Sequence, residues 1–474
     1  MSGTPLVERL SAADHYSVLG DDFGWPWDIG VLAVVDGARL PDGGSRLGID
    51  AVRRRVEPRL RLVPRFRQVL YRPARGLGWP VWADAQSFDI ADHVRVFPLP
   101  APAGESELLA ACERLRRQRL DPARPLWQLW LLPGLPQQRV GLFLRMHHAI
   151  ADGVAGVAAL GALLDLAVDA PTPAAPPWRP APTPAAGELF RDNLRRRRQG
   201  LERTLGHLAH PAGALSQLRA DWPAWREVFA EERAPRTSLN RPIGADRKLA
   251  IIRSSLDVAK QIAHAHGAKV NDVVLTAVAG GLRDLLEGRG ESAGGLVLRA
   301  MVPVSLHREQ PGPARGNLDG MIVVPLPVGE PDPIRLLHQV AAQTAVRKNK
   351  AHPQAMSTGI FQFTAARRAV TRLAARQRRF SLTVTNVPGP PVPLYLAGAP
   401  LLEVFPLVPI VGNQTLNVAA FSYAGQLNLT AVADNDTCPD VNVFAHGVRT
   451  TLHKLAQPAV MTAPEQASAL PEKS

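Results

Sequence analysis

Cysteine is scarce in this sequence. Its 474 residues include two, Cys112 and Cys438, which stand far apart and outside any CxxC or Cys/His spacing. Zinc sites and disulfide frameworks need such clusters, so we expect no metal, no disulfide framework and a reducing compartment. The motifs GxxxxGK[ST] and HExxH are also missing. Their absence excludes the common phosphate-loop and zinc-protease sites.

Long apolar runs are missing as well. No uninterrupted stretch reaches the roughly 18 apolar residues that a membrane-spanning helix needs. The first residues, MSGTPLVERLSAADHY, lack the basic and apolar segments of a secretory leader. We therefore expect a cytoplasmic protein whose membrane contact is peripheral. Aromatic residues make up only 5% and form no basic, aromatic-rich motif, so nucleic-acid binding is not expected.

Positive charge, by contrast, is abundant. Lys and Arg number 55 and Asp and Glu 42, which gives a formal net charge of +13. This excess favours anionic partners such as phosphate-bearing ligands or membranes, although an Arg-, Ala- and Pro-rich composition also follows from the base composition of coding DNA. The hydrophobic content of 46% is that of a globular protein, and the length predicts two or three domains.

A proline-rich segment divides the chain. Residues 1–170 alternate apolar runs such as IGVLAVVD and VGLFLRM with helical patterns, the last over 153–170, and this rhythm predicts a mixed α/β half. Residues 171–245 begin with PTPAAPPWRPAPTPAA, a linker too rich in proline for helix or sheet. A second α/β half is predicted over 246–457, and residues 458–474 have the composition of a mobile tail.

A basic amphipathic helix is expected after the proline-rich segment. Its apolar residues recur at spacings of four, seven, four and three, and four consecutive arginines, 195–198, occupy the remaining surface. Two interpretations stay open. Either the apolar residues pack on the body of the protein, or they enter the headgroup boundary of an anionic lipid surface while the arginines contact phosphates. The apolar residues are Phe190, Leu194, Leu201, Leu205 and Leu208.

The segment RMHHAIADGVAG carries the residues best suited to chemistry, His147, His148 and Asp152, followed by Gly153. Neighbouring residues of a strand point to opposite faces, so only one of the two histidines can face a given cavity. A histidine at a strand end can accept a proton from an alcohol near neutral pH. Asp152 can hold the turn through an arginine or the backbone, and Gly153 lets the chain bend tightly. These residues alone leave both a structural and a catalytic role open.

HHAIADG matches the HHxxxDG motif of the acyl-CoA-dependent acyltransferases that resemble chloramphenicol acetyltransferase. Its surroundings are similar to the bacterial wax ester synthase/diacylglycerol acyltransferase branch, whose PLW signature stands at residues 125–127 and whose ND signature stands at residues 271–272. MVPVSLHRE, RGNLDGMIVVPLP and TNVPGPP follow in the expected order, so the resemblance extends over roughly residues 8–457. Within PLW, we interpret Trp127 as a core anchor rather than a substrate contact.

This resemblance implies two chloramphenicol-acetyltransferase-like halves, each a mixed sheet flanked by helices, with a tunnel between them that reaches His148. It implies that His148 is the general base, that His147 supports it and that Asp152 is chiefly structural. Asn271 is a candidate donor to the oxyanion, although an asparagine directly before an apolar helical pattern is also typical of a helix N-cap. Asp272 favours the same helix start through the helix dipole.

The activity implied is direct transfer of a long-chain acyl group from acyl-CoA to the hydroxyl of diacylglycerol or of a fatty alcohol. Acyl-CoA is then a co-substrate, and no cofactor is permanently bound. The implied location is the inner face of the membrane or the lipid-droplet surface. Two alternatives stay open: the same scaffold acting on a short alcohol, a polyketide or a peptidyl hydroxyl, or a lipid-droplet binding protein without turnover.

Overall fold

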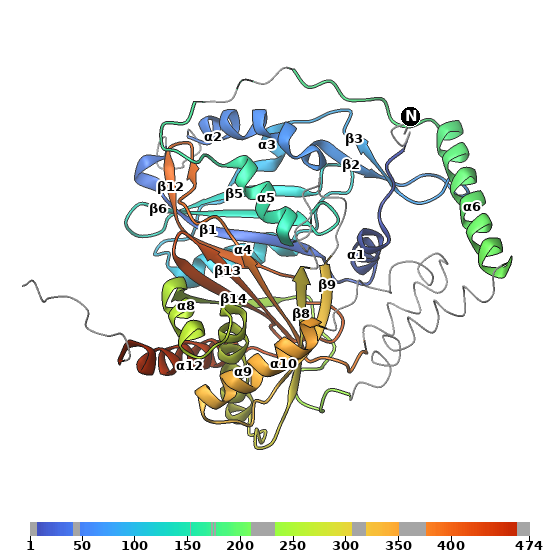
Figure 1. Cartoon of the computed structure of the whole chain (residues 1–474). Helices are drawn as coiled ribbons and strands as arrows, with labels where there is room; N and C mark the ends of the chain where they lie inside the picture. Colours follow the sequence, from blue (N-terminus) through green and yellow to red (C-terminus); the bar gives the residue numbers. More distant parts are fainter. Residues whose placement is uncertain are drawn as a thin grey trace, which may run out of the picture.

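The chain folds into two halves, each built on a six-stranded mixed sheet with helices packed against it (Figure 1). This architecture comes from a computed structural model. The residues it describes are 7–40, 48–151, 153–171, 174, 177–209, 233–305, 319–349 and 376–461. Two mixed sheets of this kind were expected from the sequence.

The first sheet has the strand order β11-β12-β1-β6-β5-β4, and β4 and β5 are its parallel pair. Its strands are β1 (Asp28–Asp36), β4 (Val94–Val96), β5 (Trp127–Pro133), β6 (Arg139–His147), β11 (Tyr395–Leu396) and β12 (Ala399–Leu407). After its first residue β6 is buried on both faces. Its continuous apolar run, VGLFLRM, reflects this central position, because no residue of the run meets water.

Strands β11 and β12 reach the first sheet from beyond the linker. β12 pairs with β1 along most of its length, with Gly30 opposite Leu407 and Val35 opposite Leu401. The division of the chain at the linker therefore does not coincide with the division between the two sheets. The domain limits expected from composition stay a prediction.

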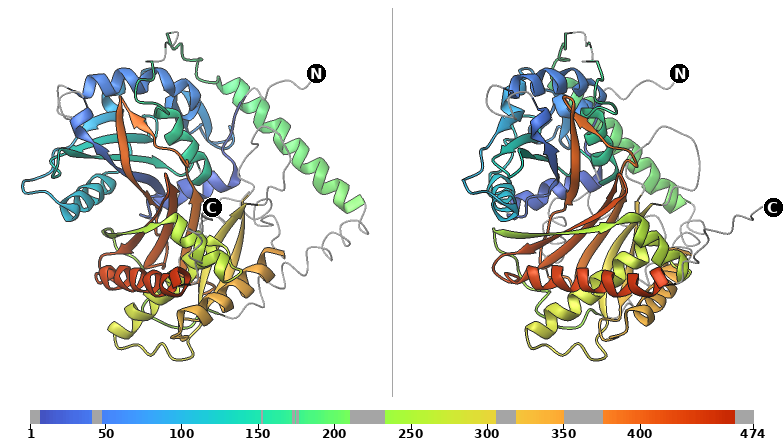
Figure 2. Two further views of the ribbon diagram at one scale, coloured as in Figure 1. Left: turned by 60° about the vertical axis from the view of Figure 1, so that its left-hand side comes forward. Right: turned by 90° about the vertical axis from the view of Figure 1, so that its left-hand side faces the viewer.

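The second sheet has the order β7-β14-β13-β10-β8-β9, in which β10 runs parallel to both of its neighbours. Its strands are β7 (Arg247–Ser255), β8 (Leu298–Ser305), β9 (Asp319–Leu326), β10 (Leu382–Pro388), β13 (Leu416–Tyr423) and β14 (Gln426–Asp434). Its helices are α8 (Leu256–Ala265), α9 (Val270–Gly288), α10 (Pro333–Asn349) and α12 (Val441–Met461). Figures 1 and 2 show α9, α10 and α12 on the side of this sheet turned away from the first half.

Two glycines let α9 and α12 pack closely. A Cβ at Gly280 would lie 2.0 Å from Thr451 Oγ1, and one at Gly281 would lie 2.7 Å from the Phe444 carbonyl oxygen. The contact buries most of the apolar residues of α9 and forms the core of the second half. A further apolar cluster joins the two halves, and it includes Leu32, Phe143, Leu249, Ile251 and Phe405.

Several helices and a short hairpin complete the first half. They are α1 (Ala12–Asp22), η1 (Gly37–Arg39), α2 (Ile49–Val56), η3 (Glu57–Leu62), η4 (Pro64–Arg67), β2 (Gln68–Tyr71), β3 (Val81–Asp84), α3 (Ile90–His93), α4 (Glu105–Arg117) and α5 (Gly153–Leu163). Helix α5 is shorter than the helix expected over 153–170. It ends at Leu163 because Asp165 is buried against Arg55 and Arg59 and its backbone pairs with Tyr395.

The proline-rich segment is extended where it is described, and it is docked on the first half. The Ala181 amide donates to Asp84 at the end of β3 (2.9 Å), and the Ala181 carbonyl accepts from Gln86 (2.8 Å). The Trp178 ring lies under the guanidinium of Arg67, 4.9 Å from ring centroid to Cζ. These contacts fix the path along which the chain reaches the next helix.

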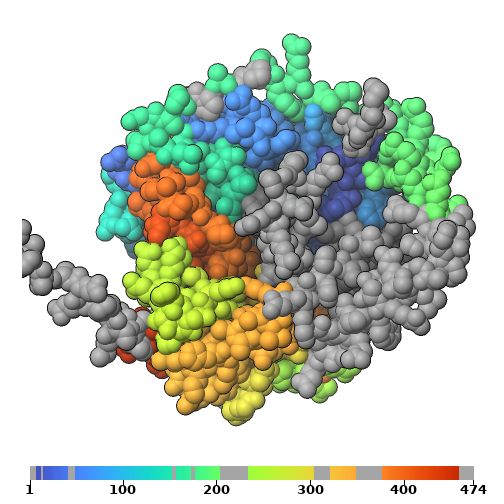
Figure 3. Space-filling view, in the orientation of Figure 1, coloured from blue at the N-terminus to red at the C-terminus, as the bar shows by residue number. Residues whose placement is uncertain are grey.

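That helix is α6 (Ala186–Ala209), at the outer flank of the molecule (Figures 2 and 3). Its first turns are tied down by the buried Arg9–Asp192 ion pair (2.6 Å) and by a hydrogen bond from Asn193 to Gly76 (2.7 Å). Its predicted apolar residues, in contrast, face outward. Phe190, Leu194 and Leu201 are 54%, 57% and 60% exposed. Packing on the body of the protein is therefore the wrong interpretation for these three; the side chains of Leu205 and Leu208 lie outside the described ones.

Candidate active site

The two histidines of the HHAIADG segment stand where β6 ends. Strand β6 lies between β1 and β5, and the backbone amides of the histidines bond to opposite neighbours. His147 donates to the Leu126 carbonyl (2.9 Å) and His148 donates to the Trp27 carbonyl (2.8 Å). This alternation is that of extended backbone, in which successive side chains take opposite directions. The sequence-based prediction that the two rings face different surroundings is confirmed by their different burial.

His147 is a buried connector. Its Nδ1 accepts a hydrogen bond from the Ala149 amide (3.0 Å), which assigns the hydrogen of the neutral ring to Nε2. Nε2 lies 3.2 Å from a carboxylate oxygen of Asp21, a distance that gives attraction although the hydrogen-bond angle is poor. The other oxygen of Asp21 accepts from the Trp27 amide (3.3 Å). These contacts hold the His147 ring on the protein side of the strand end. Its supporting role stays a prediction.

His148 is only half-buried. Its imidazole meets the indole of Trp27 edge to face, with centroids 5.6 Å apart and planes at 90°. Of the two histidines, His148 is therefore the more exposed. An imidazole in such a position can accept a proton near neutral pH. Its assignment as base, and the tunnel expected to lead to it, stay predictions.

Asp152 lies outside the described residues, so its expected structural pairing stays a prediction. Gly153 is the first residue of α5, where the chain turns from the histidine segment into the helix. Among the described residues, no group of three or more His, Cys, Asp or Glu side chains is placed to hold a metal ion.

Two buried charges behind His147 were not foreseen from the sequence. Asp28 pairs with His147 across β1 and β6, and its carboxylate lies 3.7 Å from the Arg145 guanidinium. Arg145 is bound more closely by Gln128 (2.8 Å) and by the Arg116 carbonyl (3.0 Å). Burial raises the pKa of Asp28 above its ordinary range, against the opposing attraction of Arg145 and His147. No sequence spacing relates residues 28 and 145, because only strand pairing brings them together.

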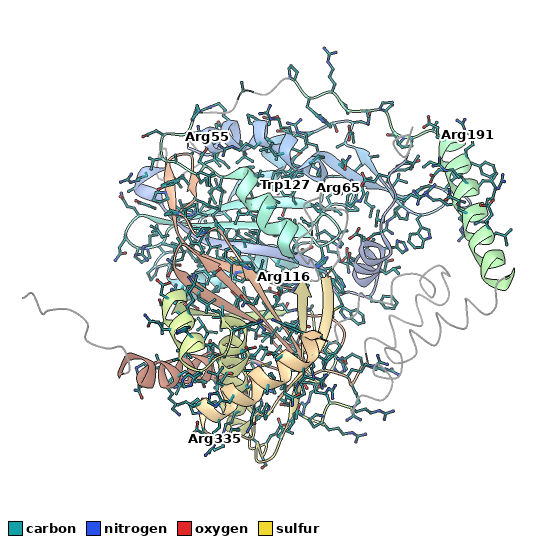
Figure 4. The ribbon with its side chains drawn as sticks, viewed as in Figure 1. Arg55, Arg65, Arg116, Trp127, Arg191 and Arg335 are labelled. Carbon is teal, nitrogen blue, oxygen red and sulfur yellow. The ribbon has the colours of Figure 1, made fainter. Side chains whose placement is uncertain are left out.

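These charges line a narrow crevice between the two halves. Its walls also include Arg116 of α4 and residues of β7, β12 and β14, and Figure 4 shows Arg116 at the level where the two sheets meet. Cys112 lines the same crevice, and burial raises the pKa of its thiol far above the ordinary value. Burial likewise raises the pKa of Cys438 to about 11. Neither thiol is poised to form a thiolate nucleophile at neutral pH.

Asn271 is the second residue of α9, and the N-cap interpretation of it is wrong. Lys269 occupies the N-cap, and its amide donates to the Asp272 carboxylate (2.9 Å). Asp272 is buried and also accepts a hydrogen bond from Thr344 (2.7 Å). The acidic residue of the ND pair thus stabilises the helix start, as its position predicted. Asn271 itself is half-buried, and its role as oxyanion donor stays a prediction.

Trp127 is the core anchor that the sequence suggested. Its ring is fully buried within the first half (Figure 4). It stacks on Phe66 and His93, at 4.6 and 4.7 Å between centroids, and its Nε1 donates to the Phe66 carbonyl (2.8 Å). A ring enclosed in this way cannot contact a substrate.

Two family models match the chain. The one described as "Wax ester synthase/diacylglycerol acyltransferase catalytic domain" covers residues 10–274, and the one described as "WS/DGAT C-terminal domain" covers residues 315–456. A Mycobacterium tuberculosis protein that carries the name of a diacylglycerol O-acyltransferase is 30% identical over 96% of this chain and 91% of its own length. Another from the same organism, with the same activity in its name, is 29% identical over 90% of both chains.

Solved structures share the fold. The wax ester synthase/diacylglycerol acyltransferase from Marinobacter aquaeolei VT8 superposes with a TM-score of 0.68 at 23% identity, covering 95% of this chain and all (100%) of that one. The starter condensation domain of rhizomide synthetase, in complex with C8-CoA, superposes with a TM-score of 0.58 at 16% identity, covering 96% and 95%. The expected acyltransferase fold of two mixed-sheet halves is thereby confirmed.

Proposed function

We propose, from the premise that this chain belongs to the wax ester synthase/diacylglycerol acyltransferase family, that it transfers a long-chain acyl group from acyl-CoA to the hydroxyl of diacylglycerol or of a fatty alcohol. The chain is an acyltransferase. Acyl-CoA is the co-substrate of the proposal, and no cofactor is permanently bound. The observation that carries the proposal is the half-buried imidazole of His148 at the end of β6, directly after the buried and tethered His147.

His148 accepts the proton of the acceptor hydroxyl as the oxygen attacks the thioester carbonyl. The new C–O bond gives a tetrahedral intermediate, which collapses when the C–S bond breaks. The proton on His148 then goes to the departing thiolate, so that coenzyme A leaves as the thiol and the imidazole is neutral again. A general base of this kind contributes about 10²- to 10⁴-fold to the rate.

Direct transfer is favoured over an acyl-enzyme. A covalent route needs an activated nucleophile beside a base. Both cysteines are buried and have raised thiol pKa values. The one GxSxG match in the sequence, at residues 290–294, lies in the loop from α9 to β8 and not at a strand-to-helix elbow. Both substrates are therefore proposed to occupy the site together.

Release of free coenzyme A tests this function. Palmitoyl-CoA is offered with dioleoylglycerol, with hexadecanol or with a short alcohol, in the wild type, in His148→Ala and in His446→Ala. His446 is an exposed histidine of α12 and serves as the matched control. We expect His148→Ala to lose about 100-fold or more of the rate while it remains folded, and His446→Ala to keep the wild-type rate. An undiminished rate in His148→Ala would refute the base, and a clear preference for the short alcohol would favour a different acceptor.

The exposed face of α6 supports a second part of the proposal, contact with an anionic lipid surface. Phe190, Leu194 and Leu201 lie four and seven residues apart and therefore share one face of the helix. Arg191, Arg197 and Arg198 flank that face by helical spacing and are exposed, and Figure 4 shows Arg191 near the upper end of α6. An apolar stripe with basic borders is the pattern of helices that lie in the headgroup region. No helix among the described residues is long and apolar enough to cross a bilayer.

A further inference from the structure

Trp27 touches His148 through both its main chain and its side chain. The residue lies immediately before β1 and its carbonyl accepts the hydrogen bond of the His148 amide (2.8 Å). Its indole meets the imidazole edge to face, with 5.6 Å between centroids. One aromatic residue thus contacts both the backbone and the ring of the proposed base.

Helix α1 holds this indole in place. A Cβ at Gly20 would lie 2.1 Å from Nε1 and 2.3 Å from Cδ1 of Trp27, far closer than atoms can approach, so the indole occupies a notch that only glycine leaves open. The next residue, Asp21, accepts the hydrogen bond of the Trp27 amide (3.3 Å). The helix therefore fixes the ring and the backbone of Trp27 independently.

We propose that Trp27 is a positioning residue for His148, a role that rests on the proposed function of His148 as the base. The indole, seated in the Gly20 notch, limits the rotation of the imidazole and keeps its ring directed toward the acceptor hydroxyl. Proton transfer depends on this alignment, because small displacements of reacting groups sharply reduce the rate. Trp27 itself supplies neither charge nor proton. Its loss therefore acts on kcat rather than on the KM for acyl-CoA.

Three variants test the proposal by different routes. Trp27→Ala removes the ring, Trp27→Phe replaces it with a smaller aromatic ring, and Gly20→Ala keeps the tryptophan but fills the notch. We expect Trp27→Ala and Gly20→Ala each to lower kcat about 10- to 100-fold, with the KM for palmitoyl-CoA within about twofold of wild type. Trp27→Phe should recover most of kcat, since an aromatic ring remains beside the imidazole.

Two controls separate positioning from general damage. Gly161→Ala makes the same substitution in helix α5, where an added Cβ meets nothing within 4 Å. Trp25→Ala removes an aromatic ring of the same loop that stacks on Phe23, at 5.7 Å between centroids. Both should keep the wild-type kcat. Circular dichroism and the melting temperature identify any variant that fails to fold. If Trp27→Ala does not fold, the kcat values of Trp27→Phe and Gly20→Ala still test the positioning role.

The outcomes distinguish this proposal from the function on which it rests. If His148→Ala abolishes transfer but Trp27→Ala and Gly20→Ala change only the melting temperature, Trp27 does not position the base. Equal loss of kcat in Trp27→Phe and Trp27→Ala would also overturn the proposal. If His148→Ala itself keeps its kcat, the assignment of the base fails first.

Discussion

The carboxylate of Asp21 lies 3.2 Å from Nε2 of His147 and joins helix α1 to the strand end that carries both histidines. Its other oxygen holds the amide of Trp27 (3.3 Å), whose carbonyl in turn accepts from His148. A single side chain of α1 therefore contacts the ring of His147 and the backbone of Trp27, both of which adjoin the proposed base. The acid stands seven residues before Asp28, where β1 begins.

We predict that Asp21→Ala destabilises the protein and slows transfer, whereas Asp21→Asn does less harm. The alanine removes the acceptor of the Trp27 amide and the carboxylate close to His147. The cost is about 1 kcal/mol, because the carboxylate is partly exposed and its attraction is screened by water. The asparagine keeps one acceptor oxygen. Urea unfolding and kcat for both variants check this order, with Asp22→Ala, an exposed neighbour in α1, as the control. If Asp21→Ala and Asp22→Ala have the same stability and the same kcat, the contacts of Asp21 do not stabilise the site.

Asp28 yields a pH-dependent prediction. Burial raises its folded-state pKa above the ordinary aspartate value, so the folded chain holds the proton more tightly than the unfolded chain. Stability is then lost as the pH rises from the ordinary aspartate pKa through the raised one. Asp28→Asn removes that loss. We expect its free energy of unfolding to exceed that of wild type by about 1 kcal/mol at pH 7, and the difference to shrink at pH 4.

The control for Asp28 is Asp36→Asn at the other, partly exposed end of β1. Thermal unfolding of both variants at pH 4 and pH 7 gives the comparison. A lower stability of Asp28→Asn at pH 7 would mean that attraction to Arg145 outweighs the cost of burying the carboxylate.

Local pattern was enough to predict some parts of this molecule and not others. The strand β6 was recognisable because a central strand is apolar on both faces. The histidines at its end were recognisable because the HHxxxDG motif is a short, continuous stretch of sequence. The end of α5 was placed too late, since what stops the helix is Asp165 held by arginines about a hundred residues earlier in the chain.

The other differences have a local cause in one case and distant contacts in the rest. Asn271 resembles a helix cap, but the neighbouring Asp272 accepts the hydrogen bond of the Lys269 amide and makes Lys269 the N-cap. Asp21 and Trp27 could not be recognised from the sequence, because the histidines that they contact, His147 and His148, stand more than a hundred residues away. The crossing of β12 into the first sheet is equally invisible in composition, since its pairing with β1 depends on register between remote strands.

Helix α6 gives the last prediction, on lipid binding. Replacing Phe190, Leu194 and Leu201 together by serine removes the exposed apolar face and leaves the Arg9–Asp192 tether intact. Each of these side chains gains roughly 1.5 to 3 kcal/mol when it is fully buried, so we expect co-sedimentation with phosphatidylglycerol vesicles to fall at least about 10-fold. Val346→Ser with Val443→Ser, at exposed apolar positions of α10 and α12, is the matched control and should bind as wild type does.

Substitution of the α6 arginines distinguishes the contribution of charge to lipid binding from that of apolar insertion. Arg191, Arg197 and Arg198 changed together to glutamine should weaken binding to phosphatidylglycerol vesicles and leave binding to phosphatidylcholine vesicles nearly unchanged, because only the former carry a net negative charge. Raising the ionic strength should reproduce this loss in the wild type, since exposed charges are screened beyond about 10 Å at 0.1 M salt. If the serine variant sediments as completely as the control variant, another surface of the protein binds the lipid.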